Sequence, residues 1–302
     1  MRYERATFEL SGIARTALVR HPHGMSRPTN SVIATVVAVA LFVLPGAAAH
    51  LNPAACQSFA QYIDGVESRL ARQHANPETY LAVLNVDPSE RADTLKQLRS
   101  GSLLIESVSG GAREVPGGLL HHWRGAAFVP GAKSQDMQAL LRDYNRLSFY
   151  YSPEVESSRA LGEHAGTTTV AMRMVKRMVV TVVLDGEYDV QTQMTEAKRG
   201  GSVSRSSHIW EVEAPGTTHE HRMPEGDDGG FLWRLNSYWS FVELPDGLLI
   251  ECEAVSLTRD VPAGLRWLAA PVVQQLPRES LEFTLKATRN ALAEKSNKET
   301  HL

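Results

Sequence analysis

The residues best suited to bind or react with a ligand are charged and polar side chains near the end of the chain. Side chains alternate between the two faces of a strand. Arg234, Asn236 and Tyr238 therefore share one face of the strand-like segment 231–244. By the same period, Glu251 and Glu253 share a face of the next segment. Opposite charges on neighbouring strands predict a paired network, because buried charges are tolerated when they are paired and hydrogen-bonded.

A third segment, 203–212, extends this pattern with Arg205 and Glu211, which alternation also places on one face. If these faces point into a cavity, the network could hold a carboxylate or hydroxyl group of a ligand. In the alternative interpretation the charged faces are solvated, and Trp233 and Trp239 belong to the core face.

Aromatic side chains in the same part of the chain offer a second kind of contact, since they can stack on a ring-bearing ligand. They are Trp123, Trp210, Trp233, Tyr238 and Trp239. Met172 and Met174 would give such a pocket an adaptable lining. Ordinary core packing is the alternative for each of these residues.

Signatures of familiar catalytic and cofactor sites are missing. The sequence has no G-x-S-x-G elbow, no H-E-x-x-H, no phosphate-binding glycine loop and no dinucleotide fingerprint. His219-Glu220-His221 resembles a metal-binding cluster but has no obvious further ligands, so we expect a solvated loop and no metal or other cofactor. Glu251, Glu253 and His208 are the candidates for a general base if the protein is an enzyme.

Periodicity indicates the elements that would position these residues. Residues 53–98 have helical spacing. Segments 102–108 and 119–129 flank glycine-rich turns, as in a hairpin with a long loop. A helix is expected to begin at Ser134, which can cap it, and to end before Pro153.

Strand-like segments dominate the next hundred residues. They are 155–161, 167–176, 178–184, 188–194, 203–212, 231–244 and 248–257. Asp185-Gly186 is either a tight hairpin turn or a feature inside one long strand. Pro277 is expected to open a final helix with a buried stripe of Leu281, Leu285 and Leu292. This order predicts an α+β domain in which a curved antiparallel sheet of about seven strands wraps around a long C-terminal helix.

The N-terminus has the pattern of an export signal. An apolar run at 32–44 follows Arg27 and ends in Pro45-Gly46 and three alanines, and it is shorter than the roughly 20 apolar residues that a membrane span needs. We expect cleavage near Ala49 and a periplasmic or secreted protein. Met25 is an alternative start that would give a signal of ordinary length. The expected organisation is therefore signal 1–49, helical extension 50–99, ligand-binding domain 100–295 and polar tail 296–302.

Charge and cysteine content narrow the range of partners. Removing residues 1–49 takes five arginines and two glutamates from 31 basic and 34 acidic residues, which leaves a formal charge of −6. A mildly acidic chain gives no reason to expect nucleic acid, and no stable membrane span is expected after cleavage. Cys252 lies in an apolar segment, which favours a buried free thiol over a bridge to Cys56.

Five stretches of the sequence resemble the START-like helix-grip (SRPBCC) superfamily, in a bacterial exported branch. They are LHHWRG at 120–125, SRSSHIWEVE at 204–213, GFLWRLNSYW at 230–239, ECEAVSLTRD at 251–260 and PRESL at 277–281. The resemblance covers roughly residues 100 to 295. It implies a helix-grip fold with a cavity between the sheet and the C-terminal helix. Superfamily members include carriers, sensors and enzymes, so the fold alone does not choose a function.

Three functional hypotheses follow. The first is an exported protein that binds a small hydrophobic or amphipathic, lipid-like molecule. Its candidate ligand-binding residues are Arg205, Trp210, Glu211, Arg234, Asn236, Tyr238, Glu251 and Glu253. The second is a cyclase- or isomerase-type enzyme in the same cavity. The third is a structural or interaction protein with a filled core.

Overall fold

The computed structural model describes the backbone of residues 49–177, 181–260 and 266–300. Apart from Ala49, the predicted export signal lies outside these residues. Export and cleavage therefore stay predictions.

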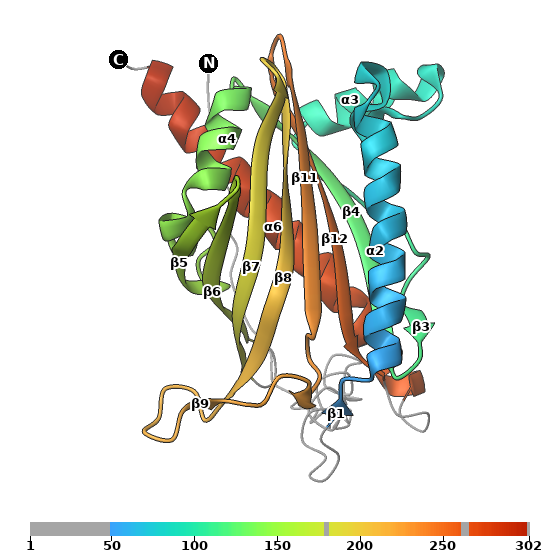
Figure 1. Cartoon of the computed structure of the whole chain (residues 1–302). Helices are drawn as coiled ribbons and strands as arrows, with labels where there is room; N and C mark the ends of the chain where they lie inside the picture. Colours follow the sequence, from blue (N-terminus) through green and yellow to red (C-terminus); the bar gives the residue numbers. More distant parts are fainter. Residues whose placement is uncertain (1–48, 178–180, 261–265, 301–302) are drawn as a thin grey trace, which may run out of the picture.

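The strands of the described chain pair entirely in antiparallel fashion, and those of the centre of the main sheet are long. Their bounds are β1 Ala49–His50, β2 Leu104–Ser107, β3 Arg113–Val115, β4 Gly118–Pro130, β5 Val155–His164, β6 Thr167–Arg177, β7 Thr181–Glu196, β8 Arg199–Glu213, β9 His221–Arg222, β10 Asp227–Asp228, β11 Arg234–Leu244 and β12 Gly247–Arg259. The main sheet runs in the order β2-β4-β12-β11-β8-β7-β6-β5, with β3 paired to β4 and β9 to β8 (Figure 1). β1 pairs separately with β10.

The helices fall into an N-terminal group, a short central group and one long C-terminal helix. Their bounds are α2 Pro53–His74, η1 Pro77–Thr79, η2 Ala82–Leu84, α3 Pro88–Arg99, α4 Ser134–Arg142, η3 Tyr144–Arg146, α5 Leu147–Tyr150 and α6 Arg266–Thr300. Asn52 caps α2, since its side-chain oxygen accepts the N–H of Ala54 at 2.8 Å. In the part of the chain that the structure describes, no helix is both long and apolar enough to cross a bilayer.

α6 and α2 cover opposite faces of the sheet (Figure 1), and we call the α6 side the inner face and the α2 side the outer face. Alternation along β12 shows the division. Ile250 and Cys252 pack with Leu281 and Leu285 of α6 on the inner face. On the outer face, Val255 packs with the buried stripe of α2, which is Phe59, Ile63, Val66 and Leu70. The predicted α+β class is confirmed, with a helix-grip arrangement and an N-terminal helical extension.

Two glycines permit close packing on the inner face. A Cβ atom at Gly125 of β4 would lie 2.5 Å from Leu285 of α6, so the missing side chain lets the helix approach the strand. A Cβ at Gly186 of β7 would lie 2.6 Å from the ring of Tyr188. β7 pairs with β6 on both sides of Asp185-Gly186 without interruption. This dipeptide therefore lies inside one long strand and makes room for Tyr188.

The two principal helix predictions need correction. α6 begins at Arg266 and continues through Pro277. A proline removes one backbone donor from a helix, but it does not necessarily end the helix. α6 also continues to Thr300, into the expected polar tail. α4 ends at Arg142, and Ser134 is not its cap. The Asp136 carboxylate accepts the N–H of Lys133 at 2.9 Å, while the Ser134 hydroxyl lies 2.9 Å from Glu243.

Candidate functional site

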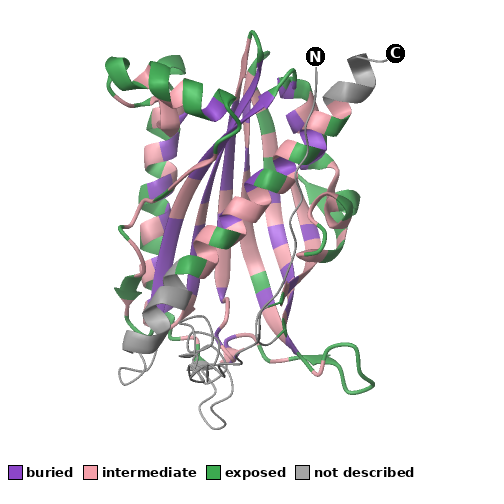
Figure 2. Cartoon of the chain, turned by 180° about the vertical axis from the view of Figure 1, so that it is seen from behind, coloured by how far each residue is buried: buried purple, intermediate pink, exposed green. Residues whose placement is uncertain are grey.

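The inner face beside α6 is lined by large apolar side chains that are only partly buried. α6 packs mainly on β4, at one side of the sheet, and Figure 2 shows half-buried stretches on the strands beside it. Around buried Val170, Leu184, Tyr188 and Ile209 lie half-buried apolar residues from β6, β11, α5 and the adjoining segments. They include Tyr144, Leu147, Met172, Met174, Phe231, Leu232 and Leu235.

Two polar atoms on the inner face of β4 have no hydrogen-bond partner within the described structure. They are Nδ1 of His121 and Nε1 of Trp123, and both are buried. Nε2 of His121 lies 3.3 Å from the Thr258 hydroxyl. Burial lowers the pKa of His121 to about 4, so the imidazole is neutral at neutral pH. An unpaired buried polar atom costs roughly 1–3 kcal/mol.

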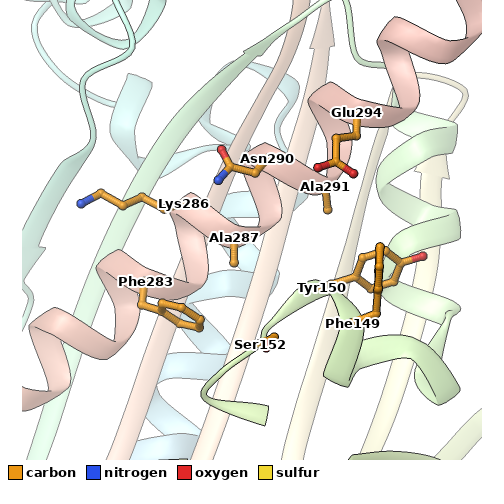
Figure 3. Close-up of a pocket in the computed structure, with 9 residues that line it drawn as sticks. All are labelled: Phe149, Tyr150, Ser152, Phe283, Lys286, Ala287, Asn290, Ala291 and Glu294. Atoms are coloured by element: carbon orange, nitrogen blue, oxygen red, sulfur yellow. The ribbon is translucent and has the colours of Figure 1, made fainter. Parts of the chain in front are cut away.

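A small hollow of about 230 Å³ lies between α6 and α5 (Figure 3). The aromatic ring of Phe149 borders it on the α5 side, and Phe283 and Asn290 border it on the α6 side. Phe149 is 63% exposed, an unusual state for a phenylalanine. Tyr150 and Ala291, which also line the hollow, pack against the inner core, so the hollow adjoins the inner face.

The outer face is polar as well as apolar, and its polar groups are paired. Glu253 is 1% exposed. Its carboxylate accepts hydrogen bonds from Nε2 of His122 at 2.8 Å, from Nε of Arg124 at 2.8 Å and from Arg69 of α2. Burial alone would raise the pKa of Glu253, but the His122 hydrogen bond and the two arginine charges outweigh it and lower the pKa to about 2.

Glu251, two residues earlier on β12, has a different environment. Its two carboxylate oxygens accept the backbone N–H groups of Ala82 and Val83 in η2, at 3.0 and 2.7 Å. Burial is the largest influence and raises the pKa of Glu251 to about 7, despite these hydrogen bonds and the charge of Arg124. Glu251 thus fixes η2 to the sheet with a carboxyl group that titrates near neutral pH.

A third polar contact joins α2 to β8 and β11. The Glu67 carboxylate accepts hydrogen bonds from Nε of Arg205 at 2.7 Å and from the Tyr238 hydroxyl at 3.0 Å. The Tyr238 hydroxyl is also 3.4 Å from the side-chain amide of Asn236. Burial raises the pKa of Tyr238, so this phenol keeps its proton.

The structure therefore brings together five of the eight predicted site residues. Arg205, Asn236, Tyr238, Glu251 and Glu253 share the outer face, under α2 and η2. The expectation that this face borders a space beside the C-terminal helix needs correction, because α6 covers the opposite face. The paired network exists, but most of its partners come from the N-terminal helices. Whether any of these residues contacts a ligand stays a prediction.

The other three predicted residues lie elsewhere. Arg234 donates to Glu225 in the preceding loop at 2.7 Å. Trp210 lies under the guanidinium of Arg222, 4.4 Å from its ring centroid, and stacks on His208. Glu211 accepts the N–H groups of Gly229 and Phe231, which fixes a loop.

A bulge explains why Arg205 and Glu211 do not share a face. The pairing of β7 with β8 shifts between Glu187 and Tyr188, which leaves Ser207 as an extra residue on β8. One extra residue reverses the alternation beyond it. Odd-numbered residues of β8 therefore lie on the outer face before Ser207 and on the inner face after it. Arg205 and Glu211 are consequently on opposite faces.

The sequence reasoning missed the partners in α2. Glu67, Arg69 and His74 lie beside its apolar stripe, and His74 is 3.0 Å from the Ser240 hydroxyl of β11. Polar residues that flank a buried helical stripe were the available signal. They indicate a helix docked on a surface that carries opposite charge.

Comparison with known proteins gives fold-level likenesses. No family model and no curated protein match the chain. Similar solved structures include a STAR-related lipid transfer protein from Xanthomonas axonopodis, at 20% identity and a TM-score of 0.38, with 64% of this chain and 98% of that chain covered. Another is the Zhui aromatase/cyclase from Streptomyces, at 12% identity and a TM-score of 0.39, covering 60% of this chain and 96% of that chain.

Human STARD10 is a third, at 9% identity and a TM-score of 0.39, with 72% of this chain and 86% of that chain covered. All three scores are below 0.5, so the fold class depends on the chain's own sheet order and on the position of α6. On those grounds the chain has the START-like helix-grip fold that the sequence resemblance implies.

Proposed function

We propose that this protein binds one small hydrophobic or amphipathic, lipid-like molecule between the inner face of the sheet and α6. The observation that carries the proposal is the row of half-buried apolar side chains beside α6, from β6, α5 and β11. A folded protein normally closes such a surface, and apolar surface that stays accessible in a recessed position is typical of ligand sites.

Two further features support this proposal. The unpaired atoms of His121 and Trp123 offer hydrogen bonds to one polar group on an otherwise apolar molecule. The hollow between Phe149 and Phe283 adjoins the same face and is a suitable entry for a ligand. The likenesses in fold to lipid-transfer proteins and to aromatase/cyclases are compatible with a hydrophobic ligand.

The enzymatic alternative gains less support from the placement of its candidate bases. Glu251 and Glu253 lie on the outer face, bonded to η2 and α2. His208 lies 2.8 Å from Glu225 and is stacked on Trp210, away from the inner cluster. A binding role requires no such base.

The test is a titration of the purified chain with Nile red, an uncharged dye whose fluorescence rises in apolar surroundings. In Met172→Lys a charged group would enter the inner face, and we expect the dye affinity to fall by about tenfold or more. Ala171→Lys is the matched control, because the neighbouring half-buried residue points to the outer face. Equal dye binding by Met172→Lys and the unaltered chain would contradict the proposal.

Native mass spectrometry of the protein isolated from its own host would then identify the natural molecule. We also propose that the protein acts after export, on the basis of the apolar run 32–44 and the small residues up to Ala49. The N-terminal residue of the isolated protein tests this, and a chain that still begins at Met1 or Met25 would contradict it.

A further inference from the structure

A second recess lies on the outer face, between α2 and the β3–β4 region. Its volume is about 530 Å³, within the range of small-molecule sites. Val66 and Val115 line it with apolar side chains above the buried Leu120 and His122, and Tyr62, Arg113 and Glu114 contribute polar groups. The sheet separates this cleft from the inner face, so the two sites lie on opposite faces.

A glycine in the middle of α2 leaves the cleft open. Gly65 lines it, and a Cβ atom at this position would have no heavy atom within 4 Å. Glycine inside a helix is less stable than alanine by about 1 kcal/mol. Here neither a tight turn nor a close backbone contact requires glycine, and the position beside it is open space.

Hydrogen bonds orient the polar floor of the cleft. The Glu253 carboxylate carries no proton, so Nε2 of His122, 2.8 Å away, is the protonated nitrogen. Nδ1 of His122 lies 3.0 Å from the Tyr62 hydroxyl. The half-buried Tyr62 is thereby held in place by the chain Tyr62–His122–Glu253.

Arg113 supplies a positive charge at the same place. Its guanidinium lies over the ring of Tyr62, 5.7 Å from the centroid. Within the described residues it forms no ion pair or hydrogen bond, in contrast to Arg69, which is bonded to Glu253 and Gln73. A guanidinium with unused donors beside apolar surface suits a carboxylate attached to an apolar group.

We propose that this cleft is a second ligand site, which binds a small amphipathic carboxylate with its charged group at Arg113 and its apolar part along Val66 and Val115. The probe is decanoate, measured by calorimetric titration of the full chain, with decanol as the uncharged comparison. In Gly65→Leu the new side chain occupies the cleft, and we expect decanoate affinity to fall about tenfold or more while the melting temperature is equal or higher. Gly65→Ala is the matched control, which gains helix stability and keeps the affinity within about twofold.

A second variant tests recognition of the charge. Arg113→Gln is expected to weaken decanoate binding by about tenfold and to leave decanol binding unchanged. Unchanged decanoate affinity in Gly65→Leu overturns the proposal, and so does an equal loss of decanoate and decanol binding in Arg113→Gln. If Met172→Lys removes decanoate binding and Gly65→Leu does not, the molecule binds at the inner face and the cleft proposal is wrong.

Discussion

Neighbouring residues of β12 meet different surroundings on the two faces of one sheet. Glu251 and Glu253 contact η2 and α2 through charged and backbone hydrogen bonds. Ile250 precedes Glu251, and Cys252 lies between the two glutamates. Both pack against apolar residues of α6. The outer face thus combines apolar packing with directional contacts, whereas the inner face depends mainly on apolar packing, which tolerates changes in the side chains or molecules that fill it.

This difference suggests a division of roles. Buried hydrogen-bonded charges define one geometry, because any displacement leaves a charge unpaired. The N-terminal helices therefore hold β4, β11 and β12 in place from the outside. The inner face is then free to keep accessible apolar surface without loss of the fold.

The largest expected effect comes from breaking the charge cluster of the outer face. Glu253→Gln removes the carboxylate that Arg69, Arg124 and His122 share, and it leaves Arg69 without an ion pair and Arg124 paired with the exposed Glu106 alone. We expect the free energy of unfolding to fall by about 3–5 kcal/mol, measured by urea denaturation at neutral pH. Glu106→Gln is the control, since Glu106 is exposed and contacts Arg124 alone at the edge of the cluster. A loss no larger than that of the control would show that the cluster does not hold the outer face.

A smaller effect with a distinctive pH dependence is expected from Glu251. The folded protein raises the pKa of Glu251 from 4.5 to about 7, so the protonated form is favoured by folding. The associated stability is fully present below pH 4.5 and is lost as the pH rises through 7. At 1.36 kcal/mol per pKa unit, the loss is roughly 3 kcal/mol.

The measurement is the free energy of unfolding of the unaltered chain and of Glu251→Gln from pH 4.5 to 8. The difference between the two proteins isolates this contribution. The difference between the two proteins should move in favour of the variant as the pH rises. Glu253 has the opposite sign, because its lowered pKa gives stability that is present above pH 4.5 and is lost as the pH falls towards 2. If the difference in unfolding free energy between the two proteins stayed constant from pH 4.5 to 8, the raised pKa of Glu251 would be contradicted.

The smallest effect on stability is expected from a substitution of Arg234, which is part of the hydrophobic core on neither face. Its ion pair with Glu225 is partly exposed. We expect Arg234→Ala to cost less than about 1 kcal/mol and to leave Nile red and decanoate affinities unchanged. A loss of binding of either molecule would place a ligand contact at the loop between β9 and β10 and would change the assignment of sites to the two faces.

The sequence allowed the fold to be predicted further than the site. Alternation and turn residues located β4, β8, β11 and β12, and the apolar stripe of α6 was predicted correctly from its spacing. Alternation also grouped Asn236 with Tyr238 and Glu251 with Glu253.

Alternation could not tell which helix each group meets. A period of two gives relative faces only, and the choice depends on contacts between residues far apart in the chain. The bulge at Ser207 had no recognisable signal in the sequence and separated Arg205 from Glu211. The cleft near Gly65 was also missed, because it forms only when β3 and β4 lie beside α2, and alternation does not show such a contact.

The position of α2 also has a consequence for how the chain folds. Its partners come late in the sequence: Glu67 and Arg205 are separated by 138 positions, and Arg69 and Glu253 by 184. Contacts of such long range form slowly, and a ribosome releases α2 well before β12. The apolar stripe of the nascent helix therefore has no surface to cover until most of the domain has been synthesised, and during that interval we expect it to be a target for chaperones.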